Sequence, residues 1–121
     1  MRTPQIGGFY DTSLPDPILR YDRVTNRFVL MEDYVTPEYT VPKGEFTDGA
    51  SRPELTNLLV RQYDRHLPAC IVHDWMYRNA IATKQDADKQ FHANLIRCGV
   101  NHSTAMMMYR AVVFGGKGAY K

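Results

Sequence analysis

The sequence predicts an α+β fold, in which a small N-terminal antiparallel sheet is followed by an antiparallel helical hairpin and a third helix. Residues 1–47 alternate short β-prone segments with Pro, Gly and Asp, which is typical of strands joined by turns. From Pro68 onward, apolar residues recur at helical spacing. The chain has 121 residues, of which 44% are hydrophobic, enough for one core. We therefore expect a single domain over residues 1–121, with a helical part at 48–115 and a mobile tail at 116–121.

Several short segments in the first part of the chain are expected to form the sheet. These expected strands span residues 18–21, 27–31, 34–36, 39–41 and 45–47. Pro37 stands between two of them and cannot donate to a ladder, so its neighbours are expected as edge or bulged strands. Gly44 follows Pro42 and Lys43 in a predicted turn before the last strand.

Three long helices are predicted over the rest of the chain. Pro68 suits a first helical turn, because its missing N–H would be unpaired there. Gly99 is expected to end the second helix, Asn101 or Ser103 to cap the third, and Pro53 to open an additional short helix. The residues expected to face inward are Cys70, His73, Tyr77 and Ile81 in the first helix, Asp88, Phe91, Leu95 and Cys98 in the second, and Ala105, Met108, Tyr109 and Val112 in the third.

Composition excludes several classes of protein. The net charge is only +2 and the basic residues are scattered, so we expect no nucleic-acid partner. No apolar run is long enough for a transmembrane segment, and residues 1–8 lack the apolar core of a signal peptide. The two cysteines, Cys70 and Cys98, are too few for a disulfide framework. Along antiparallel helices they would be offset by roughly 10 Å, so we expect no bond between them.

His73 and Asp88 are predicted to face each other across the first two long helices. The connection between these helices is short, which favours antiparallel packing. A buried carboxylate needs a partner, and a buried imidazole acting as a base needs one ring nitrogen held by an acceptor. Both needs are met if Asp88 accepts a hydrogen bond from His73. The alternative is an Asp88 that faces solvent within the polar run 85–89. The remaining histidines are expected to be ordinary surface residues: His66, His92 and His102.

Asp74 points about 100° away from His73 on a helix, so it faces a different neighbour. Asp48, in a glycine-containing turn, is a candidate companion, and the two carboxylates with turn carbonyls would suit calcium. The alternative is that Asp48 only closes the turn. No serine or cysteine stands in a nucleophile motif, which favours attack by an activated water over an acyl-enzyme.

Residues 69–79, Ala-Cys-Ile-Val-His-Asp-Trp-Met-Tyr-Arg-Asn, resemble the catalytic helix of the secreted phospholipases A2, above all the compact bacterial and fungal type. Residues 87–91 are similar to the second helix of that family, residues 108–112 to its last helix, and residues 47–49 to its calcium loop. The strand-rich first part and the missing cysteine partners depart from the family. The resemblance implies catalytic residues His73, Asp88 and Tyr77 and calcium ligands Asp48, Asp74 and the carbonyl of Gly49.

The whole chain also resembles an uncharacterised family of bacteriophages and prophages. Its members carry a Phe-Thr-Asp-Gly-Ala-Ser segment before a His-Asp-Trp-x-Tyr helix, here residues 46–51 and 73–77. This resemblance implies a phage product in the host cytoplasm, the virion or both. Our leading hypothesis is a calcium-dependent, phospholipase A2-like ester hydrolase acting on phospholipid. The alternatives are a non-catalytic tail or baseplate component that contacts other virion proteins, and a hydrolase of another cell-envelope ester or amide.

Overall fold

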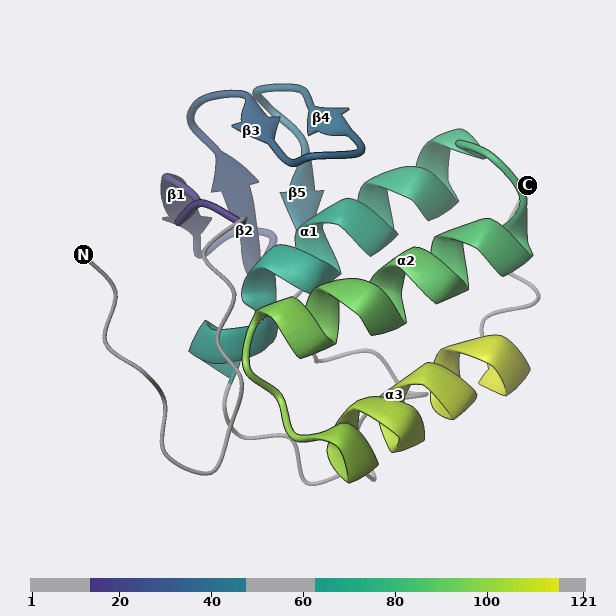
Figure 1. The fold of residues 1–121 in the computed structure, drawn as a ribbon. Coiled ribbons are helices and arrows are strands. Elements are labelled where there is room, and N and C mark those ends of the chain that lie inside the picture. Colours follow the sequence, from purple (N-terminus) through teal and green to yellow (C-terminus); the bar gives the residue numbers. More distant parts are fainter. Residues whose placement is uncertain (1–13, 48–62, 116–121) are drawn as a thin grey trace.

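The computed structural model describes residues 14–47 and 63–115 and confirms the predicted α+β fold. Its strands are β1 (Leu19–Asp22), β2 (Arg27–Leu30), β3 (Tyr34–Val35), β4 (Thr40–Val41) and β5 (Phe46–Thr47). Its helices are α1 (Tyr63–Asn79), α2 (Lys84–Arg97) and α3 (His102–Gly115). The strands lie on one side of α1, and α2 and α3 follow in turn on its other side (Figure 1).

β1, β2 and β5 form a three-stranded antiparallel sheet with β2 in the centre. The pairing sets Leu19 opposite Leu30, and Val29 opposite Phe46. In the turn between β1 and β2, Asn26 has a φ of 58°, a left-handed conformation that asparagine tolerates better than most residues. β5 lies against α1, so the sheet reaches the helical part through its last strand.

β3 and β4 form a separate two-stranded hairpin, whereas we expected all strands to join one sheet. Pro37 and Glu38 make the turn between them. The hydroxyl of Thr36 donates to the carbonyl of Tyr39 at 2.7 Å and accepts from its N–H at 2.9 Å, which closes the turn locally. Arg97 of α2 then holds Glu38 with two hydrogen bonds of 2.7 and 2.6 Å. These contacts tie the hairpin to α2.

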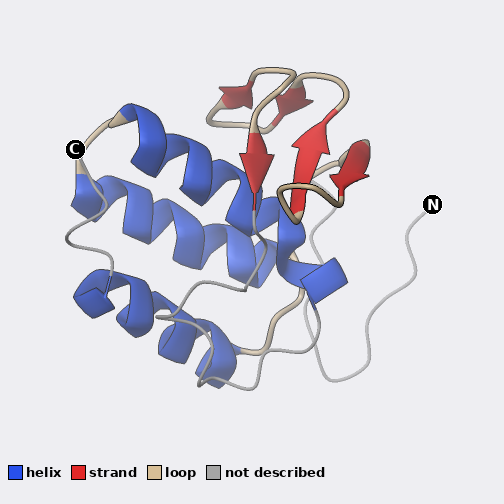
Figure 2. Cartoon of the chain, turned by 180° about the vertical axis from the view of Figure 1, so that it is seen from behind, coloured by secondary structure: helices blue, strands red, loops and turns tan. Residues whose placement is uncertain are grey.

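α1 is the central element of the fold, because it is buried on two sides (Figure 2). One cluster lies between α1, α2 and α3 and contains Leu14, Ala69, Cys70, Phe91, Leu95, Cys98, Ala105, Met108 and Val112. The other lies between α1, the strands and the first turn of α2 and contains Leu30, Tyr34, Val41, Ile71, Val72, Met76, Tyr77 and Ala87. The predicted inward stripe of Cys70, His73 and Tyr77 therefore describes only part of the buried surface of α1, and Ile81 lies beyond the end of the helix.

α1 begins at Tyr63, earlier than the predicted start at Pro68. Pro68 thus lies inside the helix, where it cannot donate the backbone hydrogen bond to the preceding turn. Packing offsets this loss, because His66, Ala69 and Cys70 around it are all buried. The prediction that His66 lies at the surface is wrong, since the additional turn of helix carries its side chain into the core.

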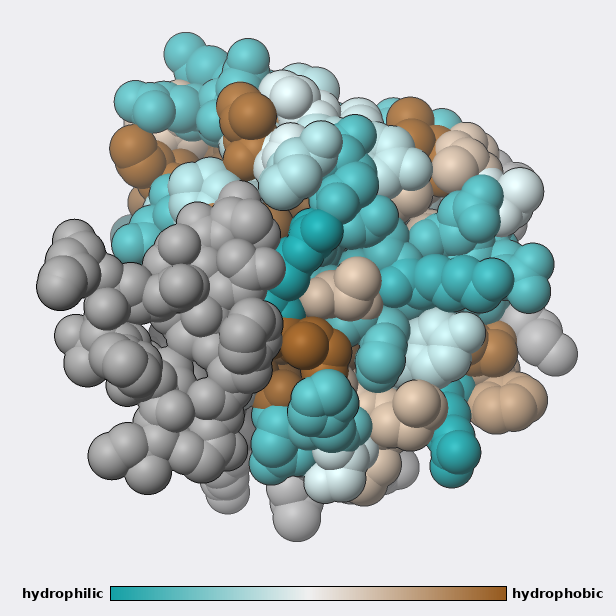
Figure 3. All heavy atoms as spheres, in the orientation of Figure 1, coloured by the Kyte–Doolittle hydropathy of each residue, from teal (hydrophilic) through white to brown (hydrophobic). Residues whose placement is uncertain are grey.

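The ends of α2 and α3 agree with the sequence. Thr83 caps α2, and its hydroxyl accepts a backbone N–H at 3.0 Å. Gly99 has a φ of 86° and ends the helix. Asn101, rather than Ser103, caps α3, because its side-chain oxygen accepts the N–H of Thr104 at 2.9 Å. The exposed side of α2 is mainly hydrophilic (Figure 3), as expected of a helix with one inward face.

Cys70 and Cys98 are both buried and are not bonded to each other, as predicted. In the described ranges, no helix has the length and apolar character needed to cross a membrane. The short helix predicted from Pro53 and the tail at 116–121 lie outside the described residues.

Candidate active site

The predicted contact between His73 and Asp88 is confirmed at the interface of α1 and α2. His73 Nε2 lies 2.8 Å from Asp88 Oδ1. The two side chains are buried, with exposed fractions of 1% and 2%. They meet because helical spacing turns both residues inward and the short connection makes the helices antiparallel. The alternative of a solvent-facing Asp88 is therefore excluded.

Tyr77 lies one helical turn after His73, and its hydroxyl donates a hydrogen bond to the same oxygen of Asp88. The ring of His73 also contacts two other rings, with centroid distances of 4.2 Å to Tyr77 and 4.6 Å to Phe91. The resemblance implied a catalytic role for Tyr77, and the structure places its side chain against both His73 and Asp88. The ring contacts and the bond to Asp88 together restrain the orientation of the imidazole.

Asp88 is ionised at neutral pH although it is buried. Burial acts to raise the pKa of the carboxyl group, but hydrogen bonds from His73, Lys84 and Tyr77 outweigh it and lower the pKa from its ordinary value. A carboxylate only accepts hydrogen bonds, so His73 Nε2 carries the hydrogen in their contact. In a neutral imidazole, Nδ1 is then the unprotonated nitrogen, which is the state that a general base requires.

Lys84, the first residue of α2, also belongs to the site, although the sequence did not predict it. Its Nζ donates to Asp88 Oδ2 at 2.6 Å. It also donates to the carbonyl oxygens of Val112 and Val113 in α3, at 3.3 and 3.1 Å. One sequence feature could have found it. A lysine at a helix N-terminus is disfavoured by the helix dipole, and this one stands four residues before an inward-facing aspartate.

Asp74 faces β5, on a different side of α1 from His73. Its Oδ2 accepts a hydrogen bond from the hydroxyl of Thr47 at 2.5 Å, and the residue is buried. Arg78, one turn further along α1, donates to the backbone carbonyl of Phe46 at 2.6 Å. The guanidinium carbon of Arg78 also lies 3.8 Å from the centre of the Phe46 ring. These contacts fix β5 on α1 beside Asp74.

Asp48 and Gly49, the other predicted calcium ligands, lie outside the described residues. Over residues 14–47 and 63–115, no group of three or more His, Cys, Asp or Glu side chains could hold a metal ion. The hydroxyl of Thr47 donates to Asp74, and Thr47 immediately precedes Asp48 in the sequence, so two of the predicted calcium ligands are linked through the end of β5. The carboxylate of Asp74 and the hydroxyl of Thr47 are hard oxygen donors, the type that calcium prefers.

A family model described as "Protein of unknown function (DUF1353)" matches residues 23–112, which are 90 of the 121 residues. The chain belongs to this family. The matched range includes His73, Asp74, Tyr77, Lys84 and Asp88. Comparison with curated proteins and with solved structures found no match for the chain. The expected membership of an uncharacterised family agrees with this finding, whereas the phage origin and the likeness to phospholipases stay predictions.

Proposed function

We propose that the protein is a calcium-dependent ester hydrolase of the phospholipase A2 type, in which His73 activates a water molecule. The observation that carries the proposal is the buried hydrogen bond of 2.8 Å between His73 Nε2 and the ionised carboxylate of Asp88. A general base needs a defined tautomer and a defined direction. The bond to Asp88 selects the tautomer of His73, and the neighbouring rings of Tyr77 and Phe91 restrain the direction of its imidazole.

In the proposed reaction, His73 Nδ1 takes a proton from water while the water oxygen bonds to the ester carbonyl carbon. The carbonyl electron pair moves onto its oxygen, and the tetrahedral intermediate then re-forms the carbonyl and expels the alcohol oxygen. The imidazolium returns the proton to that oxygen, so the products are a carboxylic acid and an alcohol. Asp88 stays ionised and stabilises the transient imidazolium. Water is itself the nucleophile, so no acyl-enzyme forms.

Asp74, Asp48 and the carbonyl of Gly49 are the proposed calcium ligands. The support is the all-oxygen character of this set and the bond between Asp74 and Thr47, the residue before Asp48. When bound, calcium supplies positive charge that polarises an ester carbonyl and neutralises the developing oxyanion. The proposed substrate is a phospholipid, and the proposed location is the host cytoplasm, the phage virion or both.

The burial of His73 favours a second candidate, a non-catalytic virion component of the tail or baseplate. The residue is 1% exposed, so a substrate reaches it only when the side chains around it move apart. A buried network of His73, Tyr77 and Asp88 also holds α1 and α2 together without any reaction. The two candidates differ in whether the network is used for chemistry or for packing alone.

Release of fatty acid from mixed phospholipid vesicles, measured with calcium and with a chelator, separates the candidates. We expect calcium-dependent release, its loss in His73→Ala and in Asp74→Asn, and its retention in His102→Ala, which removes an exposed histidine. Circular dichroism and urea midpoints check that each variant folds. Wild-type protein that binds calcium but releases nothing would point to another envelope ester or amide. Protein that neither binds calcium nor releases fatty acid, but co-purifies with phage particles, would favour the structural role.

A further inference from the structure

We propose that Lys84 is a positioning residue for the pair of His73 and Asp88, and that it makes the C-terminal end of α3 part of the site. The inference rests on the proposed function for its kinetic test, whereas its structural test stands alone. The contacts that carry it converge on the ammonium group of Lys84. Its Nζ lies 2.6 Å from Asp88 Oδ2, 3.1 Å from the carbonyl oxygen of Val113 and 3.3 Å from that of Val112.

The donors of Lys84 are fully used by these contacts. An ammonium group has three N–H donors and no acceptor. Lys84 directs one donor to a carboxylate in its own helix and two to carbonyl groups of α3. The side chain is 22% exposed, so its aliphatic stem is mostly packed against the protein. This arrangement is consistent with a role of Lys84 in supporting Asp88, because none of its N–H groups is left to bind a substrate.

The position of Lys84 runs against local helix preference and is explained only by α3. As the first residue of α2 it lies at the positive end of the helix dipole, where a cation is unfavourable. Val112 and Val113 belong to the last four residues of α3, whose carbonyl groups lack partners within the helix and carry the negative end of its dipole. From the first position of α2, Lys84 therefore donates hydrogen bonds to carbonyl groups at the C-terminal end of α3.

Lys84 restrains the oxygen of Asp88 that His73 does not use. Oδ1 of Asp88 accepts from His73 and Tyr77, and Oδ2 accepts from Lys84. Because both oxygens are held, the plane of the carboxylate is fixed, and so is the direction in which it holds the imidazole. Removal of the ammonium group would deprive a buried carboxylate oxygen of its charged partner, so Asp88 would rotate or draw in water.

The structural test compares Lys84→Met, which removes the donors and keeps an aliphatic stem, with Lys89→Met on the exposed side of α2. Proton NMR of the full chain in water follows the ring N–H of His73, which is deshielded by its bond to Asp88 and is assigned by its absence in His73→Ala. We expect this resonance in the wild type and in Lys89→Met, and its loss or upfield shift in Lys84→Met. An unchanged resonance in Lys84→Met overturns the inference.

The kinetic test uses ester hydrolysis by the same variants. We expect kcat of Lys84→Met to fall by about 10- to 100-fold through misplacement of the base, with KM and calcium affinity unchanged. Lys84→Arg keeps the charge and the donors and should restore part of kcat. If Lys84 had only a structural role, Lys84→Met would lower the unfolding temperature and leave both kcat and the ring-proton resonance of His73 unchanged. That result would overturn the inference.

Two further outcomes are distinguishable. If Lys84→Met does not fold, Lys84→Gln takes its place in both measurements, because it removes the charge and keeps a polar side chain. If the wild type hydrolyses no ester, the proposed function fails, and the ring proton of His73 still decides whether Lys84 positions the pair.

Discussion

Replacing Asp88 with Asn changes one group at the centre of the buried network. Asp88 accepts hydrogen bonds from His73 and Tyr77 on one oxygen and from Lys84 on the other. Asparagine keeps one oxygen and replaces the other with an NH2 group, which only donates. With the NH2 group toward Lys84, a donor faces the ammonium group, which cannot accept. With the NH2 group toward His73 and Tyr77, both residues must accept instead of donate, so His73 would have to carry its hydrogen on Nδ1.

We expect Asp88→Asn to lower the free energy of unfolding by about 3 kcal/mol. Removing one partner of a buried ion pair destabilises a protein by about 3–5 kcal/mol, because the remaining charge has no counter-charge. Lys84 is partly exposed and can turn toward water, which places the effect at the low end of this range. For a chain of 121 residues the unfolding entropy is roughly 0.25 kcal/mol/K, so the unfolding temperature should fall by about 12 °C.

Urea unfolding followed by circular dichroism, together with scanning calorimetry, measures this loss at pH 7. Asp86→Asn is the matched control, because it makes the same chemical change at an exposed position in the first turn of α2 and should cost at most about 1 kcal/mol. Adding Lys84→Met to Asp88→Asn should recover part of the loss, with a coupling of about 1–3 kcal/mol. Equal losses at the two aspartates, or a double variant whose effects simply add, would refute the reasoning.

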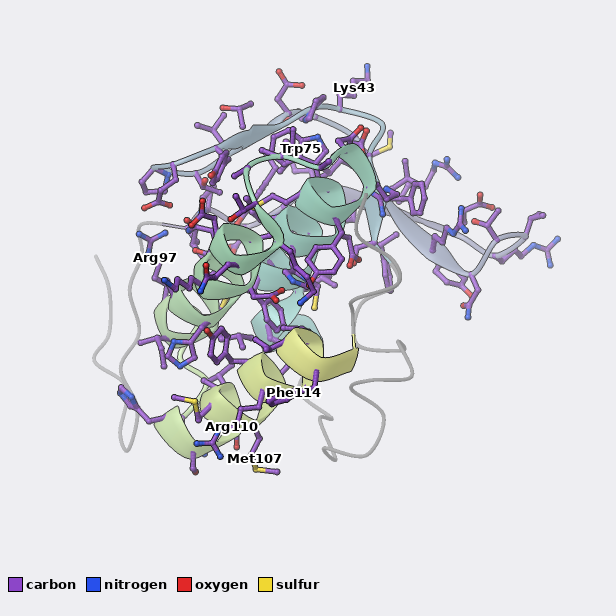
Figure 4. The ribbon with its side chains drawn as sticks, turned by 90° about the vertical axis from the view of Figure 1, so that its right-hand side faces the viewer. Lys43, Trp75, Arg97, Met107, Arg110 and Phe114 are labelled. Carbon is purple, nitrogen blue, oxygen red and sulfur yellow. The ribbon has the colours of Figure 1, made fainter. Side chains whose placement is uncertain are left out.

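Three further predictions concern packing, pH and the hairpin. Phe91→Ala should lower the free energy of unfolding by about 3–5 kcal/mol. The free energy of unfolding of Phe114→Ala should stay within about 0.5 kcal/mol of the wild type, because Phe114 is 73% exposed and projects from the outer side of α3 (Figure 4). Similar urea midpoints for Phe91→Ala and Phe114→Ala would contradict this prediction. The pKa of Asp88 is lowered by folding, so the unfolded state binds its proton more tightly. The ionised carboxyl of Asp88 therefore stabilises the fold above about pH 4, and this stabilisation is lost as the pH falls through the folded-state pKa. The loss in free energy of unfolding caused by Asp88→Asn, measured from pH 7 to pH 3, should accordingly become smaller on acidification. Arg97→Met removes both bonds to the partly exposed Glu38 and should lower the free energy of unfolding by about 1 kcal/mol or less. This loss should be smaller in 1 M salt, which screens the ion pair. A loss that does not depend on salt would show that packing of the aliphatic stem of Arg97 dominates.

The sequence by itself determined the helices from residue 68 onward and the directions in which their side chains point. Helical periodicity turned His73 and Asp88 inward, and the short connection between their helices implied antiparallel packing and hence contact. Gly99 and Asn101 marked helix ends through their own backbone and side-chain chemistry. The helix ends are recoverable because they depend on residues within one helical turn of one another, and the contact of His73 with Asp88 is recoverable because its 15 positions cross a single short connection.

Only the tertiary structure decided which distant groups contact Asp74 and Lys84. The bond between Thr47 and Asp74 spans 27 positions, and those from Lys84 to Val112 and Val113 span 28 and 29. No local period relates residues so far apart, and their contact depends on how α1, α2, α3 and β5 pack together. The start of α1 before Pro68 was decided in the same way, because burial on two sides of that helix outweighs the loss of one backbone hydrogen bond.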